Sequence, residues 1–172
     1  MKFAVIAIGL LLSQGSWGGE SSITTIVVPG KKWSIQFAGP KLQVGKSTVP
    51  GIYYGVRDRT QVSLFVESPK CAGGDADENV YSCFTEALKK NPIVLWDTER
   101  GNTAANGIHV MYMTELKVDG KTGHAMNVNV LFVHDGQWVD FHISIASPQP
   151  SDLSELDALA DSVRVIESPA TQ

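Results

Sequence analysis

The polar residues best suited to chemistry lie in the C-terminal half of the chain. Histidine and carboxylate side chains are ligands for transition metals, and amides and imidazoles hydrogen-bond small polar ligands. The candidate ligand-binding residues are His109, Asn129, Asp140 and His142. His109 and His142 are also the candidate metal ligands, but no H-x-H or H-x-x-E-H spacing joins them. We therefore expect a polar site without a resident metal, and no motif predicts a cofactor.

Whether these four residues meet depends on how three expected strands, 108–118, 121–133 and 137–146, pair with one another. The Asp135-Gly136 turn predicts that Val130 lies opposite Phe141, which makes one face of the hairpin apolar. At Asp119-Gly120 two turns are possible. A bulged loop puts His109, Asn129 and His142 in one row on the polar face, whereas a two-residue turn sends His109 to the apolar face. We favour the bulge, because it unites Ile108, Val110 and Tyr112 with the apolar face.

Cys71 and Cys83 are the two cysteines of the chain. Their spacing lacks the C-x-x-C pattern of redox-active pairs, so we expect a structural disulfide. The closed loop is short, and the chain-entropy model assigns it a stabilisation of about 3 kcal/mol. Disulfides persist in oxidising compartments, so this pair agrees with export.

The N-terminus resembles a cleaved leader. Lys2 precedes an apolar run from Phe3 to Leu12, and Ser16 and Gly18 are small residues at the spacing that signal peptidase accepts. The run is too short to span a membrane, which takes about 20 residues. We expect a signal peptide at 1–18, one globular domain at 19–167 and a flexible tail at 168–172. The mature chain is then periplasmic or secreted, without stable membrane insertion.

The remaining patterns predict an α+β fold. Strands are expected at 23–28, 32–38, 52–57 and 61–67, then at 93–96 and in the three-stranded meander. Helices are expected at 77–91, capped by Asp75 or Asp77, and at 152–164, capped by Ser151. Residues 39–50 and 97–107 are expected to be loops. Together they predict a mostly antiparallel sheet of six to eight strands with two packed helices, as in an α-β-α sandwich.

Protein binding is the function that these observations favour. The chain has 14 basic and 18 acidic residues, which argues against nucleic-acid binding. No G-x-S-x-G or other catalytic motif is present, so we expect no enzyme, with an uncharacterised hydrolase as a further alternative. Aromatic and arginine residues are enriched at interfaces. The partner-binding candidates are Tyr53, Tyr54, Arg57 and Arg59, together with the loop 97–107.

The order of elements over residues 22–166 resembles the PsbP-like domains, which include a photosystem extrinsic subunit and bacterial envelope proteins. The resemblance rests on the W-x-I-x-F strand at Trp33, the mid-chain helix, the antiparallel meander and the closing helix from Leu156 to Val163. It implies an α-β-α sandwich and a non-enzymatic accessory or binding role. Because no catalytic motif is present, we expect the partner to be another protein of the cell envelope. The alternative hypothesis is a periplasmic protein that binds a small ligand or metal on its polar sheet face.

Overall fold

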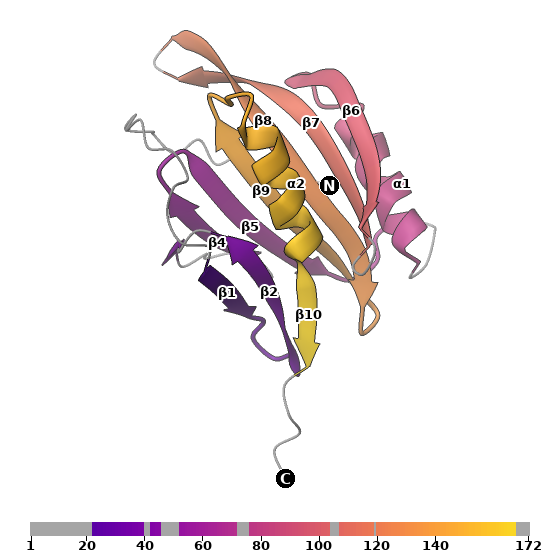
Figure 1. The fold of residues 1–172 in the computed structure, drawn as a ribbon. Helices are drawn as coiled ribbons and strands as arrows, with labels where there is room; N and C mark the ends of the chain where they lie inside the picture. Colours follow the sequence, from indigo (N-terminus) through magenta and orange to yellow (C-terminus); the bar gives the residue numbers. More distant parts are fainter. Residues whose placement is uncertain are drawn as a thin grey trace.

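The computed structural model describes residues 22–39, 42–45, 52–71, 76–103, 107–118 and 120–167. The predicted leader and tail lie outside these residues. These residues form two helices and two sheets, whose arrangement can be followed in Figure 1. The helices are α1 (Asp77–Leu88) and α2 (Asp152–Ser162). The strands are β1 (Ser22–Val27), β2 (Trp33–Gly39), β3 (Gln43–Gly45), β4 (Ile52–Arg57), β5 (Thr60–Glu67), β6 (Val94–Thr103), β7 (Gly107–Val118), β8 (Lys121–His134), β9 (Gln137–Ala146) and β10 (Arg164–Glu167).

The predicted α+β class is confirmed, but the strands of the described residues divide between two antiparallel sheets. The large sheet has seven strands in the order β3-β4-β5-β9-β8-β7-β6. The small sheet has three, in the order β1-β2-β10. The small sheet joins the two ends of the described chain, because β2 pairs on one side with β1 and on the other with β10. Sequence patterns along the chain did not predict this division.

Both faces of the large sheet are covered. Helix α1 packs on one face, whereas α2 and the small sheet form a layer on the other (Figure 1). The main core lies between the large sheet and this second layer. Its largest buried side chains include Trp33, Ile35 and Phe37 from β2, with Phe141 and Ile143 from β9. The predicted alternation of β2 is therefore confirmed, since its apolar residues face the core. A second core lies under α1, around Phe84, Leu131 and Trp138.

The register of the β8–β9 hairpin is confirmed, but the expected register of β7 is wrong. Val130 lies opposite Phe141, as the Asp135-Gly136 turn predicted. On β7, Val118 pairs with Lys121 across a two-residue turn, which places His109 opposite Val130. The expected bulge would have placed Val110 on the face of the main core. In the structure Val110 lies on the opposite face of the sheet, where α1 buries it.

Both helices begin at the predicted residues, but neither has a side-chain capping bond at its N-cap. The N-cap of α1 is Ala76, which makes no side-chain cap. Asp77, expected as a possible cap, instead accepts a hydrogen bond from the Val133 amide of β8 at 2.7 Å. Ser151 is the N-cap of α2, as predicted, but its side chain forms no capping bond. The first turn of α2 is held instead by the contact between Asp152 and Arg59.

Strands occupy two segments expected to be loops and a third, 164–167, where no strand was expected. Strand β6 extends through most of the expected loop 97–107 and pairs with β7, with an irregularity between Leu95 and Glu99. Its polar sequence suits an edge strand rather than a loop. Strand β3 lies within the expected loop 39–50 and pairs with β4. Strand β10 follows α2 directly and pairs with β2.

The Cys71–Cys83 disulfide is present, with a Cα–Cα distance of 6.0 Å. It joins the segment after β5 to the buried side of α1, where Cys83 contributes to the second core. The bridge therefore holds α1 close to the strand that precedes it. Among the described residues, no helix is long and apolar enough to cross a membrane.

Candidate functional site

A chain of polar side chains crosses the large sheet on the face that carries α1. His142 of β9 lies opposite Ser63 of β5, and its Nδ1 is 3.2 Å from the Ser63 hydroxyl. Its Nε2 is 3.1 Å from Oδ1 of Asn127 on β8. The Asn127 amide then donates to Thr114 Oγ1 on β7 at 3.1 Å. Because Asn127 Oδ1 is an acceptor, Nε2 carries the imidazole proton, and Nδ1 accepts from Ser63. Burial lowers the pKa of His142 to about 4, which agrees with a neutral ring.

Asp140 and Asn129 form a second polar pair beside this chain. The Asn129 amide donates to Asp140 Oδ1 at 2.6 Å, and both residues are buried. Burial raises the pKa of Asp140 to about 7, although the hydrogen bond from Asn129 opposes the shift and the charge of Glu67 adds to it. Burial and the nearby Asp140 also raise the pKa of Tyr112. The side-chain oxygen of Asn129, Oδ1, is buried without a hydrogen-bond partner.

The raised pKa of Asp140 makes stability depend on pH. A carboxyl whose pKa is higher in the folded state binds protons more tightly there, so its contribution to stability falls as pH rises from about 4 to about 7. We expect Asp140→Asn to be more stable than the wild type at pH 8, by roughly 2–4 kcal/mol. The difference should shrink towards pH 4, where the wild-type carboxyl is protonated. Urea unfolding at several pH values measures it.

His142 also makes stability depend on pH, but it is present in both chains, so its contribution cancels in the difference between variant and wild type. That group has a lowered pKa, so it costs stability as pH falls from 6.5 towards 4, opposite to Asp140. Asp161→Asn, the same substitution at an exposed position on α2, is the matched control and should not reproduce the stabilisation at pH 8. An Asp140→Asn variant that is less stable than the wild type at pH 8 would contradict the expectation.

The structure brings together three of the four predicted ligand-binding residues. Asn129 of β8 lies opposite His142 of β9 on the α1 face. Asp140, two residues before His142 on β9, lies on the same face. His109 lies on the other face of the sheet, opposite Val130, so it cannot converge with His142. The predicted row of His109, Asn129 and His142 is therefore wrong, because a one-residue change of register reverses every side chain of a strand. Among the described residues, no three His, Cys, Asp or Glu side chains gather as a metal site requires.

Ser63, His142 and Asn127 have the residue types of a nucleophile, a base and an orienting amide. The geometry does not favour hydrolysis, because the Ser63 residue is only 4% exposed and lies flat on the sheet between neighbouring strands. A nucleophile must reach the carbonyl carbon of a substrate. The arrangement instead satisfies buried polar groups across four strands, which is a structural role.

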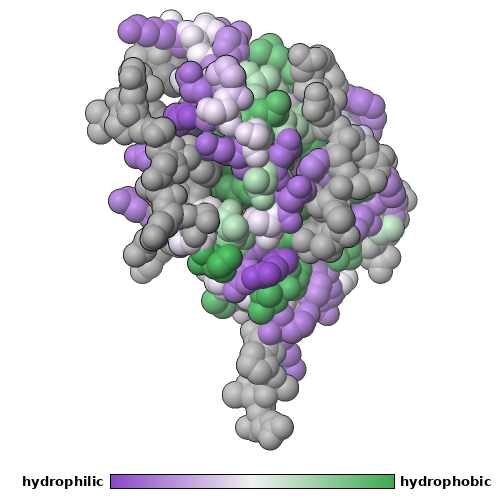
Figure 2. Space-filling model, viewed as in Figure 1, coloured by the Kyte–Doolittle hydropathy of each residue, from purple (hydrophilic) through white to green (hydrophobic). Residues whose placement is uncertain are grey.

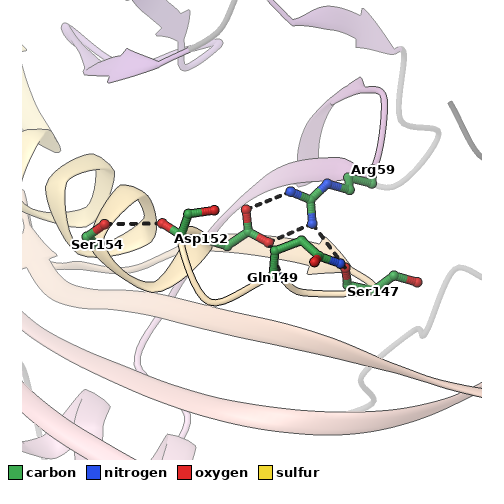
Figure 3. Close-up of polar contacts among 6 residues, drawn as sticks. Arg59, Ser147, Gln149, Asp152 and Ser154 are labelled. Atoms are coloured by element: carbon green, nitrogen blue, oxygen red, sulfur yellow. Dashed lines mark hydrogen bonds and ion pairs between the residues drawn. The ribbon is translucent and has the colours of Figure 1, made fainter. Parts of the chain in front are cut away.

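Of the partner-binding candidates, Tyr53, Tyr54 and Arg57 lie on β4. Their side chains are outside the described part of the structure. Arg59 is described, and its side chain makes contacts within the chain. Its guanidinium makes two hydrogen bonds of 2.6 Å to the Asp152 carboxylate and one of 3.0 Å to the Ser147 carbonyl (Figure 3). An intramolecular ion pair thus engages Arg59, and its role in partner binding stays a prediction.

The outer face of the small sheet is the strongest candidate for an interaction surface among the described residues. It consists of three cross-strand rows that point away from the core. The rows are Ile23 with Ala38, then Thr25 with Gln36 and Arg164, and then Val27 with Ser34 and Ile166. Ile23 is 59% exposed and Val27 is 70% exposed.

The middle row of this outer face is polar. Gln36 donates from Nε2 to Thr25 at 3.2 Å and accepts at Oε1 from Arg164, with the shorter contact at 2.7 Å. Figure 2 shows apolar groups over β1, β2 and β10 on either side of strongly polar ones. The surface thus presents two apolar ends around a polar centre that carries one guanidinium.

Sequence reasoning missed this surface although it predicted strands β1 and β2. Residues 22–27 contain Ile23, Ile26 and Val27, so neither face of the strand is clearly polar. The pairing with β2 decides the matter, because Trp33, Ile35 and Phe37 fix which side faces the core. The apolar residues on the opposite side of β1 are then left in solvent.

The comparisons with known proteins support the fold. No family model matches the chain, and no curated protein matches it. Among solved structures, the chain is similar to the Ran-binding protein Mog1p of Saccharomyces cerevisiae, known from a crystal structure at 1.9 Å resolution. The TM-score is 0.55 at 10% sequence identity, and the match covers 86% of this chain and 97% of Mog1p. At this identity the likeness shows the fold alone: the chain has an α+β fold similar to that of Mog1p.

Proposed function

We propose that this chain is an exported, non-enzymatic accessory protein that binds another protein of the cell envelope through the outer face of its small sheet. The observation that carries the proposal is the exposure of Ile23 and Val27 on one face of β1. Exposed apolar residues grouped on one face are a feature of binding surfaces. The Cys71–Cys83 disulfide supports an oxidising compartment, and with it the leader expected at 1–18.

The chemistry of the face defines the partner that it fits. Apolar side chains would pack against Ile23 and Val27 at its two ends. At its centre Arg164 gives two of its donors to Gln36, and a guanidinium has five, so others remain for an acceptor. The complementary surface is therefore an apolar patch that includes a carboxylate. Mog1p, which has the same general fold, is a protein-binding protein by its description, and this agrees with the proposal.

Site-specific photocrosslinking in the native compartment tests the proposal. A photoreactive residue at Val27 should capture a polypeptide of defined mass, whereas the same residue at Lys90, which is exposed beyond the end of α1, should not. The captured protein, once purified, should bind the wild type at least tenfold more tightly than Val27→Asp. Thr122→Asp, at an exposed position of β8, is the control that should bind normally. Equal binding of all three chains would contradict the proposal.

A second candidate function is the binding of a small polar ligand on the α1 face, by Asn129, Asp140 and His142. The observation that favours it is the unpaired Asn129 carbonyl oxygen beside Asp140. Native mass spectrometry of the mature protein from its own compartment separates the two candidates. A second polypeptide supports the accessory role, and a small added mass that Asp140→Asn loses supports the ligand.

A further inference from the structure

Strand β1 is an edge strand, and it differs from the other sheet edges of the described chain. Exposed edges offer free backbone groups to other strands, and proteins usually protect them by shortness, charge, proline or bulges. Strand β3 has three residues, and β10 has four, with charged residues at both ends. Strand β6 carries Asp97, Glu99 and Arg100 in its sequence and is irregular between Leu95 and Glu99. Each of these three edges therefore has a protective feature.

The edge formed by β1 has none of these features. Its sequence, SITTIV, contains no charged residue and no proline. It runs six residues in unbroken register against β2, from Ser22 opposite Gly39 to Val27 opposite Ser34. Among the strands that the structure describes, it has a neighbour on one side only. Its exposed residues are mostly β-branched and therefore suit a further strand. An unprotected edge of this kind is a template for strand addition.

The sequence of β1 is complementary to itself. In an antiparallel pair centred on Thr25, the residue opposite Thr25 is Thr25 of the second copy. Ile23 then lies opposite Val27 of the second copy, and Val27 opposite its Ile23. All three positions lie on the outer face, so two apolar β-branched pairs flank a threonine pair, and such cross-strand pairs are favourable. A two-fold axis relates the copies, as in most protein dimers.

Charge also permits this pairing. Two identical strands bring like charges together wherever they carry any, and β1 carries none. The charged residues that follow it, Lys31 and Lys32, come after the Pro29-Gly30 turn. An antiparallel arrangement places the lysines of the two copies at opposite ends of the pair. There they are separated by more than the screening length of about 8 Å.

We propose that β1 pairs antiparallel with β1 of a second copy of this chain, about a two-fold axis at Thr25. The two three-stranded sheets then form one sheet, and the exposed apolar residues of both copies become neighbours on its outer face. The outer face itself stays open, because the contact uses the backbone edge. The dimer therefore joins two of the proposed binding surfaces into one. Since six residues make a small interface, the dimer should be weak and dependent on concentration.

The first test is the oligomeric state of the purified mature chain. Sedimentation velocity should show a reversible monomer–dimer equilibrium over a wide concentration range. Thr25→Lys places two ammonium groups opposite each other at the axis, and it should weaken dimerisation at least tenfold. Thr122→Lys, the same substitution at an exposed position of β8, should dimerise like the wild type. Thr25→Val should also dimerise, which excludes loss of the contact with Gln36 as the cause.

The second test is cysteine crosslinking, which reports the register. Directly opposite residues have Cα atoms about 4.5–5.5 Å apart, which a disulfide can bridge. Thr25→Cys should therefore form a covalent dimer on mild oxidation, at least tenfold faster than the Thr122→Cys control. Ile23→Cys alone should not, since its two copies lie about 13 Å apart along the pair. A mixture of Ile23→Cys and Val27→Cys chains should form the mixed dimer.

A chain that stays monomeric at every concentration, with Thr25→Cys no faster than its control, would overturn the proposal. So would a dimer that Thr25→Lys leaves intact. Both tests use the chain alone, so their outcome does not depend on the envelope partner proposed above. A chain that dimerises but captures no envelope partner contradicts only the proposed function. A chain that captures the partner but stays monomeric contradicts only the proposed dimer.

Discussion

Replacing Arg59 with alanine is expected to lower the free energy of unfolding by about 3–5 kcal/mol, because it leaves a buried carboxylate without its charged partner. Asp152 is 1% exposed on its side chain, and the Arg59 side chain is 16% exposed. The guanidinium holds both carboxylate oxygens at 2.6 Å. It also bonds the Ser147 carbonyl, so it joins the β4–β5 turn to the segment that leads into α2. Urea unfolding at pH 7 measures the loss.

The pH dependence of this loss shows whether the ion pair is its cause. Burial raises the pKa of Asp152, but the hydrogen bonds from Arg59 and the Gln149 amide outweigh it, and the net pKa is lowered. A lowered carboxyl pKa contributes stability above its unfolded value of about 3.8, and that contribution is lost as pH falls through the folded pKa. The difference between the wild type and Arg59→Ala should therefore decrease at acid pH. A constant difference would mean that lost packing, and not the ion pair, is responsible.

Two further variants serve as controls for the ion pair. Arg59→Lys keeps the positive charge but loses the two-pronged geometry, so its loss should be intermediate. Arg59→Ala combined with Asp152→Ala removes both partners, and the double variant should be more stable than the sum of the single losses implies. Additive losses would contradict a direct interaction between the two side chains.

Replacing Phe141 with alanine is expected to cost about 3–5 kcal/mol of unfolding free energy. Phe141 is fully buried on β9, in the interior of the large sheet. Its ring contacts the ring of Phe37 on β2. The two ring centroids are 5.0 Å apart, and the ring planes are inclined at 56° to each other. The pair therefore joins the two sheets at the centre of the main core. Removing one ring leaves a cavity that close packing around it cannot fill.

A conservative variant separates the cavity from other effects. Phe141→Leu keeps most of the volume and should cost less than half as much as Phe141→Ala. Because Phe37 and Phe141 share one contact, the double alanine variant should lose less than the sum of the single variants. Urea unfolding followed by far-UV circular dichroism measures all of these values. A loss below about 1 kcal/mol for Phe141→Ala would show that the sheets do not depend on this contact.

Several local features of the fold could be predicted because their causes lie close together in the sequence. The Asp135-Gly136 turn fixed the register of β8 and β9, since a two-residue loop allows one pairing. The alternation of Trp33, Ile35 and Phe37 predicted the buried face of β2. The even number of cysteines predicted their bridge. Of the candidate site, this local reasoning correctly placed Asn129, Asp140 and His142 on one face.

The features that sequence reasoning missed depend on contacts between distant segments. The side of β7 on which His109 lies depends on α1, which buries Val110 and Tyr112 on the opposite face. Strand β10 forms because β2 offers it an edge more than a hundred residues away in sequence. Arg59 resembles a surface arginine until α2 brings Asp152 to it.

The sequence by itself therefore determined the class of fold, the position of most elements, the disulfide and the register of the β8–β9 hairpin. Each of these follows from hydrophobic periodicity and turn chemistry within a few residues. Only the tertiary structure decided the split into two sheets, the loss of the predicted histidine row and the exposure of one face and one edge of β1. The physical reason is that a strand has two faces and two edges. Which of them is buried depends on the segments that pack against it.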